Sequence, residues 1–422
     1  MSRLLCPSSS TSVVRRARPT FVLGNLSIKQ AQGTGASSAL ARRRRSTFAA
    51  TADGLHVIPL EQKYPFPWLR DACRCPDCVH PSTRQKLFCT SDIPVDIQPA
   101  TNGVEEVGEG VKIRWSNGHE SLYDWDFLKE HSSSVSRSEA NKDLPRVGWT
   151  RASIAKERDL YLEYEELKTK EGLRKAIDHT CRFGLLFIRN VPNVETSTAS
   201  CSLRTLAHYF GDIRTTFYGE LWDVKNVSNS RNIAYTNLGL GLHMDLLYFQ
   251  HPPQFQFLHC LRNRVQGGSS IFSDALHAAE TLRIQDAASY SVLTDVQVPF
   301  FYVNDGHHLY HTHPTIEVSA SGDVNQINYS PPFQAPLLLD TPPAFFTALH
   351  QFSNLVNSDE NTYEYTLEEG DAVLFDNRRV LHARRAFEEI PGQGVRVGEA
   401  NRWLKGCYIE GDTMWDRGRM LR

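Results

Sequence analysis

Two apolar stretches of this 422-residue chain carry residue types that could bind a metal. The segment "GLGLHMDLLYF" places His243 and Asp245 two positions apart, and "GDAVLFDNRRVLHARRAF" is expected to form one strand of apolar residues whose end presents His382. An ionised Asp is costly in such a stretch unless it is paired or ligates a metal, and a strand projects residues i and i+2 to the same face. The alternative is a surface-facing pair on an edge strand.

Two His and one carboxylate on neighbouring strands form the facial triad of non-haem Fe(II) oxygenases, which leaves coordination positions open for a cosubstrate and O₂. Arg402, in "NRWLKGCY", lies on the next expected strand. A buried Arg facing the metal needs an anion, and its fork geometry suits a dicarboxylate held bidentately. The pattern therefore predicts an iron centre that works with an anionic cosubstrate.

A second group of metal-binding side chains precedes the first in "WLRDACRCPDCVHP", which contains Cys73, Cys75 and Cys78. Three thiolates on a tight loop can converge on one tetrahedral Zn²⁺, which then needs a fourth ligand. His80 is near, but it would strain the loop, whereas His119 lies on an expected hairpin that could fold back. The alternative is a set of buried or free thiols.

The elements around the cysteines predict a small β-rich domain over residues 54–131. "VKIRWSNGHESLYDWDFL" alternates polar and apolar residues around an Asn-Gly turn, which is typical of a hairpin. Residues 132–149 are polar and lack periodicity, so we expect a linker there.

Residues 150–422 are expected to form a second domain. A helical pattern in "LKTKEGLRKAIDHTCRFG" is followed by the short apolar strand "GLLFIRNVP". From about residue 185, short strand-like runs dominate, and two amphipathic helices near 274–287 and 342–357 interrupt them. Many strands with few helices predict a mainly β fold with flanking helices, of the sandwich or jelly-roll kind.

The start of the chain differs in composition from the rest. Residues 1–50 are rich in Arg and Ser, include the run Arg42–Arg45, and precede the first acidic residue, Asp53. This composition predicts a mitochondrial transit peptide, processed between about Arg45 and Ala50, and therefore a location in the mitochondrial matrix. The alternative is a disordered basic tail.

Composition also excludes several classes of function. The net charge of −2 offers no overall basic field for nucleic acid or an anionic membrane, and the cysteine cluster lacks a flanking basic, aromatic-rich face. No apolar run approaches the ~18 residues of a membrane span. Nine cysteines in a chain of this length do not indicate a secreted disulfide scaffold. A small-molecule substrate is therefore expected.

The motifs together resemble the γ-butyrobetaine and trimethyllysine dioxygenases, TauD/TfdA-like enzymes of carnitine synthesis that depend on Fe(II) and 2-oxoglutarate. The resemblance runs from "PWLRDACRCPDC" through "TTFYGELWDV", "IAYTNLGLGLHMD" and "FDNRRVLHARR" to "NRWLKGCYIEGD". It implies an N-terminal zinc-binding domain followed by a double-stranded β-helix (jelly roll). It also implies O₂ as cosubstrate and is compatible with ascorbate as an additional cofactor. It also suggests a homodimer.

The resemblance assigns roles to particular residues. It implies an iron site of His243, Asp245 and His382. It implies a 2-oxoglutarate site of Arg402 assisted by Ser270. It implies a structural zinc site of Cys73, Cys75, Cys78 and His119.

The resemblance extends unevenly to the substrate pocket. Aromatic residues match at the trimethylammonium end, where π faces suit a cation that cannot donate a hydrogen bond; these are Tyr218, Trp222, Tyr235 and Tyr408. Without the resemblance they would be interpreted as core aromatics. At the carboxylate end Asn232 matches, but Leu246 and Ser330 stand where γ-butyrobetaine hydroxylases carry Tyr and Asn.

We therefore expect a hydroxylase of a trimethylammonium acid, with γ-butyrobetaine, giving carnitine, ahead of trimethyllysine. Leu246 and Ser330 motivate a second hypothesis, in which the same oxygenase acts on another betaine-like or amino-acid-like substrate. A third hypothesis, from another class, is a catalytically inactive mitochondrial zinc-binding structural protein.

Overall fold

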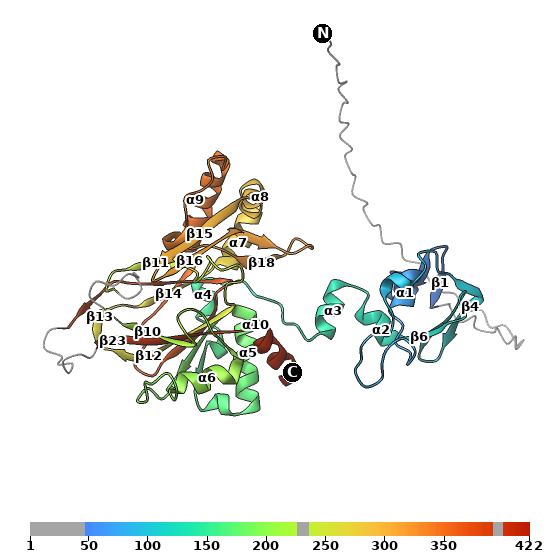
Figure 1. The fold of residues 1–422 in the computed structure, drawn as a ribbon, viewed down its shortest axis with the longest axis horizontal. Helices are drawn as coiled ribbons and strands as arrows, with labels where there is room; N and C mark the ends of the chain where they lie inside the picture. The colour runs from blue at the N-terminus through green and yellow to red at the C-terminus, as the bar shows by residue number, and fades with distance from the viewer. Residues whose placement is uncertain (1–46, 226–235, 391–399) are drawn as a thin grey trace, which may run out of the picture.

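The structure is a computed structural model that describes residues 47–225, 236–390 and 400–422. Figure 1 shows a small N-terminal region (residues 47–131) joined by helix α3 (Ser134–Ala140) and an extended segment to a larger C-terminal region (residues 150–422). Within the described ranges, neither region has a helix with the length and hydrophobicity that crossing a membrane requires.

The N-terminal region packs two three-stranded antiparallel sheets around one hydrophobic cluster that includes Trp115 and Phe66. The strands are β1 (Phe48–Ala50), β2 (Gly54–Val57), β3 (Gln62–Pro65), β4 (Pro99–Val107), β5 (Gly110–Trp115) and β6 (Glu120–Asp124), and the helices are α1 (Phe66–Asp71) and α2 (Trp125–Glu130). The predicted hairpin is confirmed by β5 and β6, whose turn places Gly118 at a φ of 87°.

The structure adds detail at both ends of the N-terminal region. Strand β1 pairs with β2, so the sheet includes residues 48–50 of the segment predicted as a transit peptide; residues 1–46 of that segment lie outside the described residues. Helix α3 lies within the predicted linker 132–149 and is capped at its N-terminus by Ser133, whose hydroxyl accepts from the backbone N–H of Ser136.

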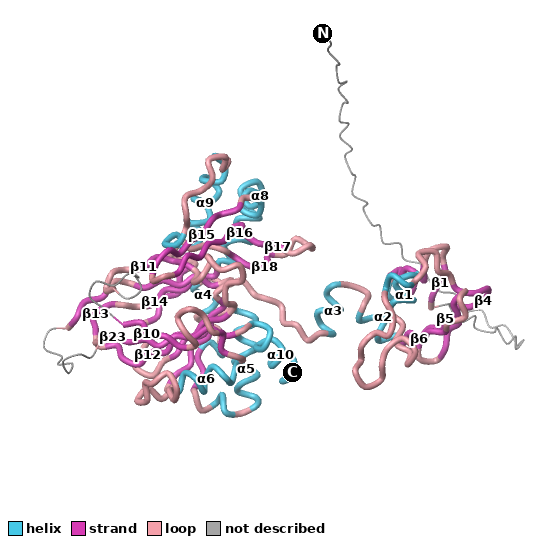
Figure 2. Tube along the Cα trace, viewed as in Figure 1, coloured by secondary structure: helices cyan, strands magenta, loops and turns pink. Residues whose placement is uncertain are grey.

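The C-terminal region contains a large sheet and a small sheet that both line one pocket. The large sheet has the order β10–β23–β12–β20–β8–β7, with β9 beside β23, and the small sheet has the order β11–β21–β14–β19. In Figure 2 the strands of the two sheets form separate layers. The mainly β prediction is confirmed, whereas the jelly roll itself stays a prediction.

The strands of the large sheet are β7 (Tyr161–Glu163), β8 (Leu185–Arg189), β9 (Ile213–Arg214), β10 (Leu221–Lys225), β12 (Phe255–Asn263), β20 (Ala372–Asp376) and β23 (Arg402–Ile409). Those of the small sheet are β11 (Leu240–His243), β14 (Ser270–Asp274), β19 (Thr362–Tyr365) and β21 (Val380–Arg384). Three two-stranded ribbons complete the set: β13 (Val265–Gly267) with β22 (Phe387–Glu389), β15 (Gln297–Asn304) with β16 (His307–Pro314), and β17 (Ile316–Val318) with β18 (Val324–Ile327).

Helices flank the sheets more extensively than the sequence patterns predicted. They are α4 (Arg151–Ile154), α5 (Lys170–Phe183), α6 (Ser202–Phe210), α7 (Ala275–Gln285), α8 (Ala287–Asp295), α9 (Pro343–Asn357) and α10 (Gly411–Leu421). The predicted helices at 274–287 and 342–357 are confirmed by α7 and α9. Helix α8 was missed because its nine residues include the weak helix formers Ser, Tyr, Val and Thr.

The segment containing His382 is not a single strand, contrary to the prediction. It breaks after Asp376, whose side chain accepts from the backbone N–H of Arg378 and whose carbonyl accepts from Arg379. Arg379 is fully enclosed and forms an ion pair of 2.8 Å with Asp274. This turn sends β20 into the large sheet and β21 into the small one, so a single short segment joins the two walls of the pocket.

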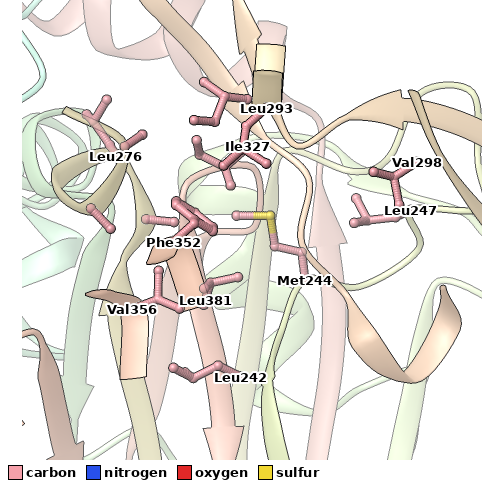
Figure 3. Close-up of a cluster of buried hydrophobic side chains, with 14 of the residues drawn as sticks. Leu242, Met244, Leu247, Leu276, Leu293, Val298, Ile327, Phe352, Val356 and Leu381 are labelled. Atoms are coloured by element: carbon pink, nitrogen blue, oxygen red, sulfur yellow. The ribbon is translucent and has the colours of Figure 1, made fainter. Parts of the chain in front are cut away.

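A hydrophobic cluster packs against the small sheet, and part of it also lines the pocket. Figure 3 shows Met244 extending into this cluster near Phe352, Ile327 and Leu381. Met244 is fully buried, while its neighbours His243 and Asp245 line the pocket. The alternation of side chains thus anchors the His-x-Asp segment through its central residue.

Buried histidines of the C-terminal region predict acid sensitivity. Burial lowers the pKa of His259 on β12 and His179 on α5 to about 4 from 6.5. Between these values the unfolded chain binds more protons, so stability is lost as the pH falls below 6.5, by up to on the order of 3 kcal/mol per group. Thermal unfolding of metal-free protein from pH 7 to pH 4.5 should show this loss, and His259→Gln should reduce it; an unchanged pH slope would contradict the prediction.

Candidate active site

The two histidines of the predicted triad face each other on paired strands. His243 on β11 is the antiparallel partner of His382 on β21, and their ring centroids are 4.2 Å apart. Nδ1 of His243 lies 2.8 Å from the carbonyl oxygen of Gly241. This geometry places a proton on Nδ1 and leaves Nε2 as the metal-binding lone pair.

Asp245 completes the cluster from beyond the end of β11. Its Oδ1 lies 3.5 Å from Nε2 of His243, and its Oδ2 lies 4.0 Å from Nε2 of His382. One ligand atom from each residue fits within 4.8 Å of the others, which is compatible with a single ion. The prediction that the pair shares a face is confirmed, but the strand ends at His243, and Leu246 then takes a left-handed φ of 64°.

The environments of His382 and Asp245 suit the binding of a cation. Burial and the neighbouring His243 lower the pKa of His382 to about 3, so the imidazole is neutral at physiological pH. Burial acts to raise the pKa of Asp245, but the interactions of its carboxylate with His243, His382 and Gln256 outweigh burial, and the pKa falls below its ordinary value. The cluster offers two imidazole nitrogens and a carboxylate.

Asn377 holds the backbone of Asp245, a role that the sequence patterns did not reveal. This fully buried amide accepts from the N–H of Asp245 at 2.8 Å and donates to the carbonyls of Asp245 at 3.0 Å and Pro253 at 3.1 Å. Asn377 sits in the turn between β20 and β21, so it ties the Asp245 peptide to the strand that carries His382. Its position five residues before His382 in "FDNRRVLH" was the available signal.

We expect Asn377→Ala to lower the free energy of unfolding by about 2–3 kcal/mol, because buried backbone groups lose their partners, and also to weaken metal binding. Thermal unfolding and Fe(II) titration would measure the two effects. Asn361→Ala is the matched control, since Asn361 is also buried and its amide donates to Leu355 outside the pocket. If Asn377→Ala binds Fe(II) as tightly as Asn361→Ala does, Asn377 contributes to stability and not to metal binding.

One end of the pocket is cationic. Arg402, at the start of β23, is 4% exposed, its Nε has no partner, and its Nη2 reaches the Gly268 carbonyl only at 3.5 Å. Burial and the neighbouring Arg384 lower the pKa of Arg402 to about 10, so it stays charged near neutral pH. Ser270, paired with Arg384 across β14 and β21, also lines the pocket. A buried guanidinium with an unused donor is suited to an anion.

The other end of the pocket is aromatic. The rings of Trp222 and Tyr408 lie 4.3 Å apart at 32°, and Tyr218 lies 6.3 Å from Trp222. All three line the same pocket as the metal-binding cluster. Tyr235 and Asn232, predicted to join them, lie outside the described residues. We call Tyr218, Trp222 and Tyr408 the aromatic group.

The two residues that depart from the expected pattern lie in different places. Leu246 contributes directly to the pocket wall, together with the ring of Phe333. Ser330 is 1% exposed with an unpartnered hydroxyl, and it is not among the pocket-lining residues. Of the two residues that differ from γ-butyrobetaine hydroxylases, Leu246 is therefore the one that lines the pocket.

The N-terminal region holds the second predicted metal cluster. The sulfur atoms of Cys73, Cys75 and Cys78 lie 3.3, 3.6 and 3.4 Å from Nε2 of His119. The structure thus selects His119 and not His80, whose ring instead contacts Ser82 and Thr83 locally. Burial and the adjacent Cys73 raise the pKa of Cys78 to about 12. Three thiols around one imidazole are the ligand set of a closed structural Zn²⁺ site.

Cys78→Ser should remove zinc and unfold the N-terminal region, because structural zinc contributes on the order of 10 kcal/mol to folding of such sites. Elemental analysis and limited proteolysis would report both losses. Cys89→Ser is the control, since Cys89 is an exposed thiol of the same region. Full zinc content in the Cys78→Ser variant would exclude the assignment.

The N-terminal region and the C-terminal region each match a known protein family. Residues 146–408 match the family model "Taurine catabolism dioxygenase TauD, TfdA family", and residues 58–129 match "Gamma-butyrobetaine hydroxylase-like, N-terminal". A γ-butyrobetaine dioxygenase of Pseudomonas sp. (strain AK-1) is 33% identical, with 84% of this chain and 89% of the relative covered. A human γ-butyrobetaine dioxygenase is 28% identical over 89% of this chain and 96% of its own. The mitochondrial trimethyllysine dioxygenase of Bos taurus is 26% identical, with coverages of 85% and 83%.

Proposed function

The chain belongs to the TauD, TfdA family of dioxygenases, and from this premise we propose that it is an Fe(II)- and 2-oxoglutarate-dependent hydroxylase of a trimethylammonium acid, with γ-butyrobetaine as first candidate. One observation carries the proposal. The two-His, one-Asp cluster shares a pocket with the unpartnered Nε of Arg402 and with the aromatic group. Relatives named γ-butyrobetaine dioxygenase support the choice of substrate.

The residues of the pocket fit the groups that this function requires. His243, Asp245 and His382 would hold Fe(II), and Arg402 with Ser270 would hold the distal carboxylate of 2-oxoglutarate. When bound, iron and 2-oxoglutarate supply the oxidising power, with O₂ as oxidant and succinate and CO₂ as by-products. The protein binds, orients and encloses the reactants, which is where its catalytic contribution lies.

The aromatic group suits the ammonium end of the substrate. A quaternary ammonium donates no hydrogen bond, and each π face contributes about 0.5–2 kcal/mol to its binding. Trp222 and Tyr408 lie on neighbouring strands β10 and β23 of the large sheet, across the pocket from the histidines of the small sheet. Binding there would place one C–H bond of the substrate toward the metal-binding cluster.

The assay follows succinate formation from 2-oxoglutarate by the Fe(II)-loaded full chain, with γ-butyrobetaine, trimethyllysine or no substrate. Mass spectrometry detects a product heavier by one oxygen atom. The matched control is 5,5-dimethylhexanoic acid, which replaces the ammonium nitrogen by carbon and should not stimulate turnover. Equal stimulation by this analogue, whose head group is uncharged, would contradict the role of the aromatic group, and no stimulation by either quaternary ammonium compound would reject the proposed substrate class.

Trimethyllysine is the second candidate, because Leu246 weakens the match to γ-butyrobetaine. This apolar side chain forms part of the pocket wall where a polar contact to the γ-butyrobetaine carboxylate was expected, and losing such a contact costs about 1–3 kcal/mol. A relative named trimethyllysine dioxygenase supports this alternative. Of γ-butyrobetaine and trimethyllysine, the compound with the lower KM in the same assay is the better candidate. Slow succinate formation without a hydroxylated product would indicate another betaine-like or amino-acid-like substrate.

The proposal includes the organisation and location of the protein. Residues 54–131 would form a structural zinc-binding domain, 132–149 a linker and 150–422 a double-stranded β-helix oxygenase domain. The Arg-rich, acid-free composition of residues 1–50 and the mitochondrial relative support a matrix location. Fractionation of cells that express the full chain, followed by sequencing of the mature N-terminus, would test this location.

A further inference from the structure

Tyr408 belongs to the aromatic group and also contacts the metal-binding cluster. Its hydroxyl donates a 3.1 Å hydrogen bond to Oδ2 of Asp245, while its ring packs against Trp222. We propose that Tyr408 is a positioning residue that orients the Asp245 carboxylate for the metal and links that orientation to occupancy of the aromatic group. The inference rests on the proposed function, which supplies the metal and the cationic substrate.

Asp245 needs such an orienting contact more than the histidines do. His243 and His382 are fixed by backbone pairing, with His382 also paired to Phe272 on β14. Asp245 follows the last residue of β11, so no strand pairing directs its side chain. Asn377 fixes its peptide group but does not contact its carboxylate. The direction of the carboxylate therefore depends on its own hydrogen bonds.

The hydrogen bond from Tyr408 distinguishes the two carboxylate oxygens. Oδ2 accepts from the hydroxyl, whereas Oδ1 is the oxygen nearer to His243, at 3.5 Å. A carboxylate that accepts a hydrogen bond through one oxygen keeps the other available as a single metal ligand. Monodentate ligation of this kind leaves more positions for the cosubstrate and O₂.

The backbone of β23 fixes the ring of Tyr408. Tyr408 pairs with Gln256 on β12, and Gly406, two positions earlier on the same face, pairs with Trp222 on β10. A Cβ atom at position 406 would lie 2.7 Å from the indole ring of Trp222. Glycine therefore allows the indole to lie flat over β23 and reach Tyr408.

This geometry couples the substrate and metal sites. A trimethylammonium group packed against the ring of Tyr408 would restrict the ring torsion and thereby hold the hydroxyl toward Asp245. Binding couplings are reciprocal, so the substrate should tighten metal binding by the same factor as the metal tightens substrate binding. Removing the hydroxyl while keeping the ring should abolish this coupling.

The test compares Tyr408→Phe with the wild-type protein, using Co(II) in place of Fe(II) and isothermal titration calorimetry on zinc-loaded full chain. We expect Tyr408→Phe to bind Co(II) roughly tenfold more weakly and to lose the tightening caused by γ-butyrobetaine. Tyr365→Phe is the matched control, because the Tyr365 hydroxyl donates to Asp371 at 2.9 Å outside the pocket. This control should bind Co(II) as the wild type does.

Each outcome decides the proposal. Wild-type Co(II) affinity in Tyr408→Phe would overturn the positioning role, and an equal weakening in Tyr365→Phe would reduce the effect to general destabilisation. Retained tightening by γ-butyrobetaine in Tyr408→Phe would overturn the coupling. If the wild type does not turn over γ-butyrobetaine, the proposed substrate is wrong, whereas the titration with Co(II) alone still decides whether Tyr408 positions Asp245.

Discussion

Replacing His382 by Ala should abolish turnover, with a loss of at least about 10³-fold in the rate of succinate formation, and leave the fold intact. His382 supplies one of the two nitrogen ligands, and the remaining ligand atoms of His243 and Asp245 cannot close a three-ligand face on one ion. The substitution removes a neutral imidazole that lines the pocket, so Asp245 loses no charged partner. Stability should therefore change far less than activity.

The measurement combines succinate formation, iron content after anaerobic loading, and circular dichroism. His350→Ala is the control, since His350 is an exposed residue on α9 whose ring contacts Asn354 one turn away. This control should keep wild-type iron content and activity. Coupled decarboxylation at the wild-type rate in His382→Ala would remove His382 from the triad.

The second large effect is expected for Arg402→Met, which should raise the KM for 2-oxoglutarate by about 100-fold. Methionine keeps much of the buried volume but removes the charge that would pair with the distal carboxylate. Charge-assisted bidentate bonds of this kind contribute about 3 kcal/mol, which corresponds to two orders of magnitude in affinity. The kcat at saturating 2-oxoglutarate should fall much less, because the metal ligands are unchanged.

Two further variants sharpen the interpretation of Arg402. Arg402→Lys keeps the charge but loses the planar fork, so its KM should lie between those of the wild type and Arg402→Met. Arg385→Gln is the control, because Arg385 is exposed and pairs with Glu364 outside the pocket. An unchanged KM for 2-oxoglutarate in Arg402→Met would show that the cosubstrate carboxylate binds elsewhere.

Local patterns in the sequence were sufficient to predict much of the fold. The Asn-Gly hairpin, α5, α7 and α9 follow from periodicity and turn chemistry within single segments. The assignment of β20 and β21 to different sheets could not be predicted in this way. The turn between them is made locally at Asp376, but it is also held by the ion pair of Arg379 with Asp274, whose partners are 105 residues apart. Periodicity is a local property, whereas the partner of a buried charge is set by the packing of the whole domain.

By itself, the sequence determined the chemistry available to this protein: the His-x-Asp pair, the later His382, the buried-strand Arg402 and the three clustered cysteines. Residue type defines which metals and anions can be bound, and this property is independent of folding. Only the tertiary structure decided which groups meet. It selected His119 over His80, brought Asn377 and Tyr408 to Asp245, and separated Leu246 from Ser330. These contacts join segments distant in the chain, and their distances arise only when the two sheets enclose one pocket.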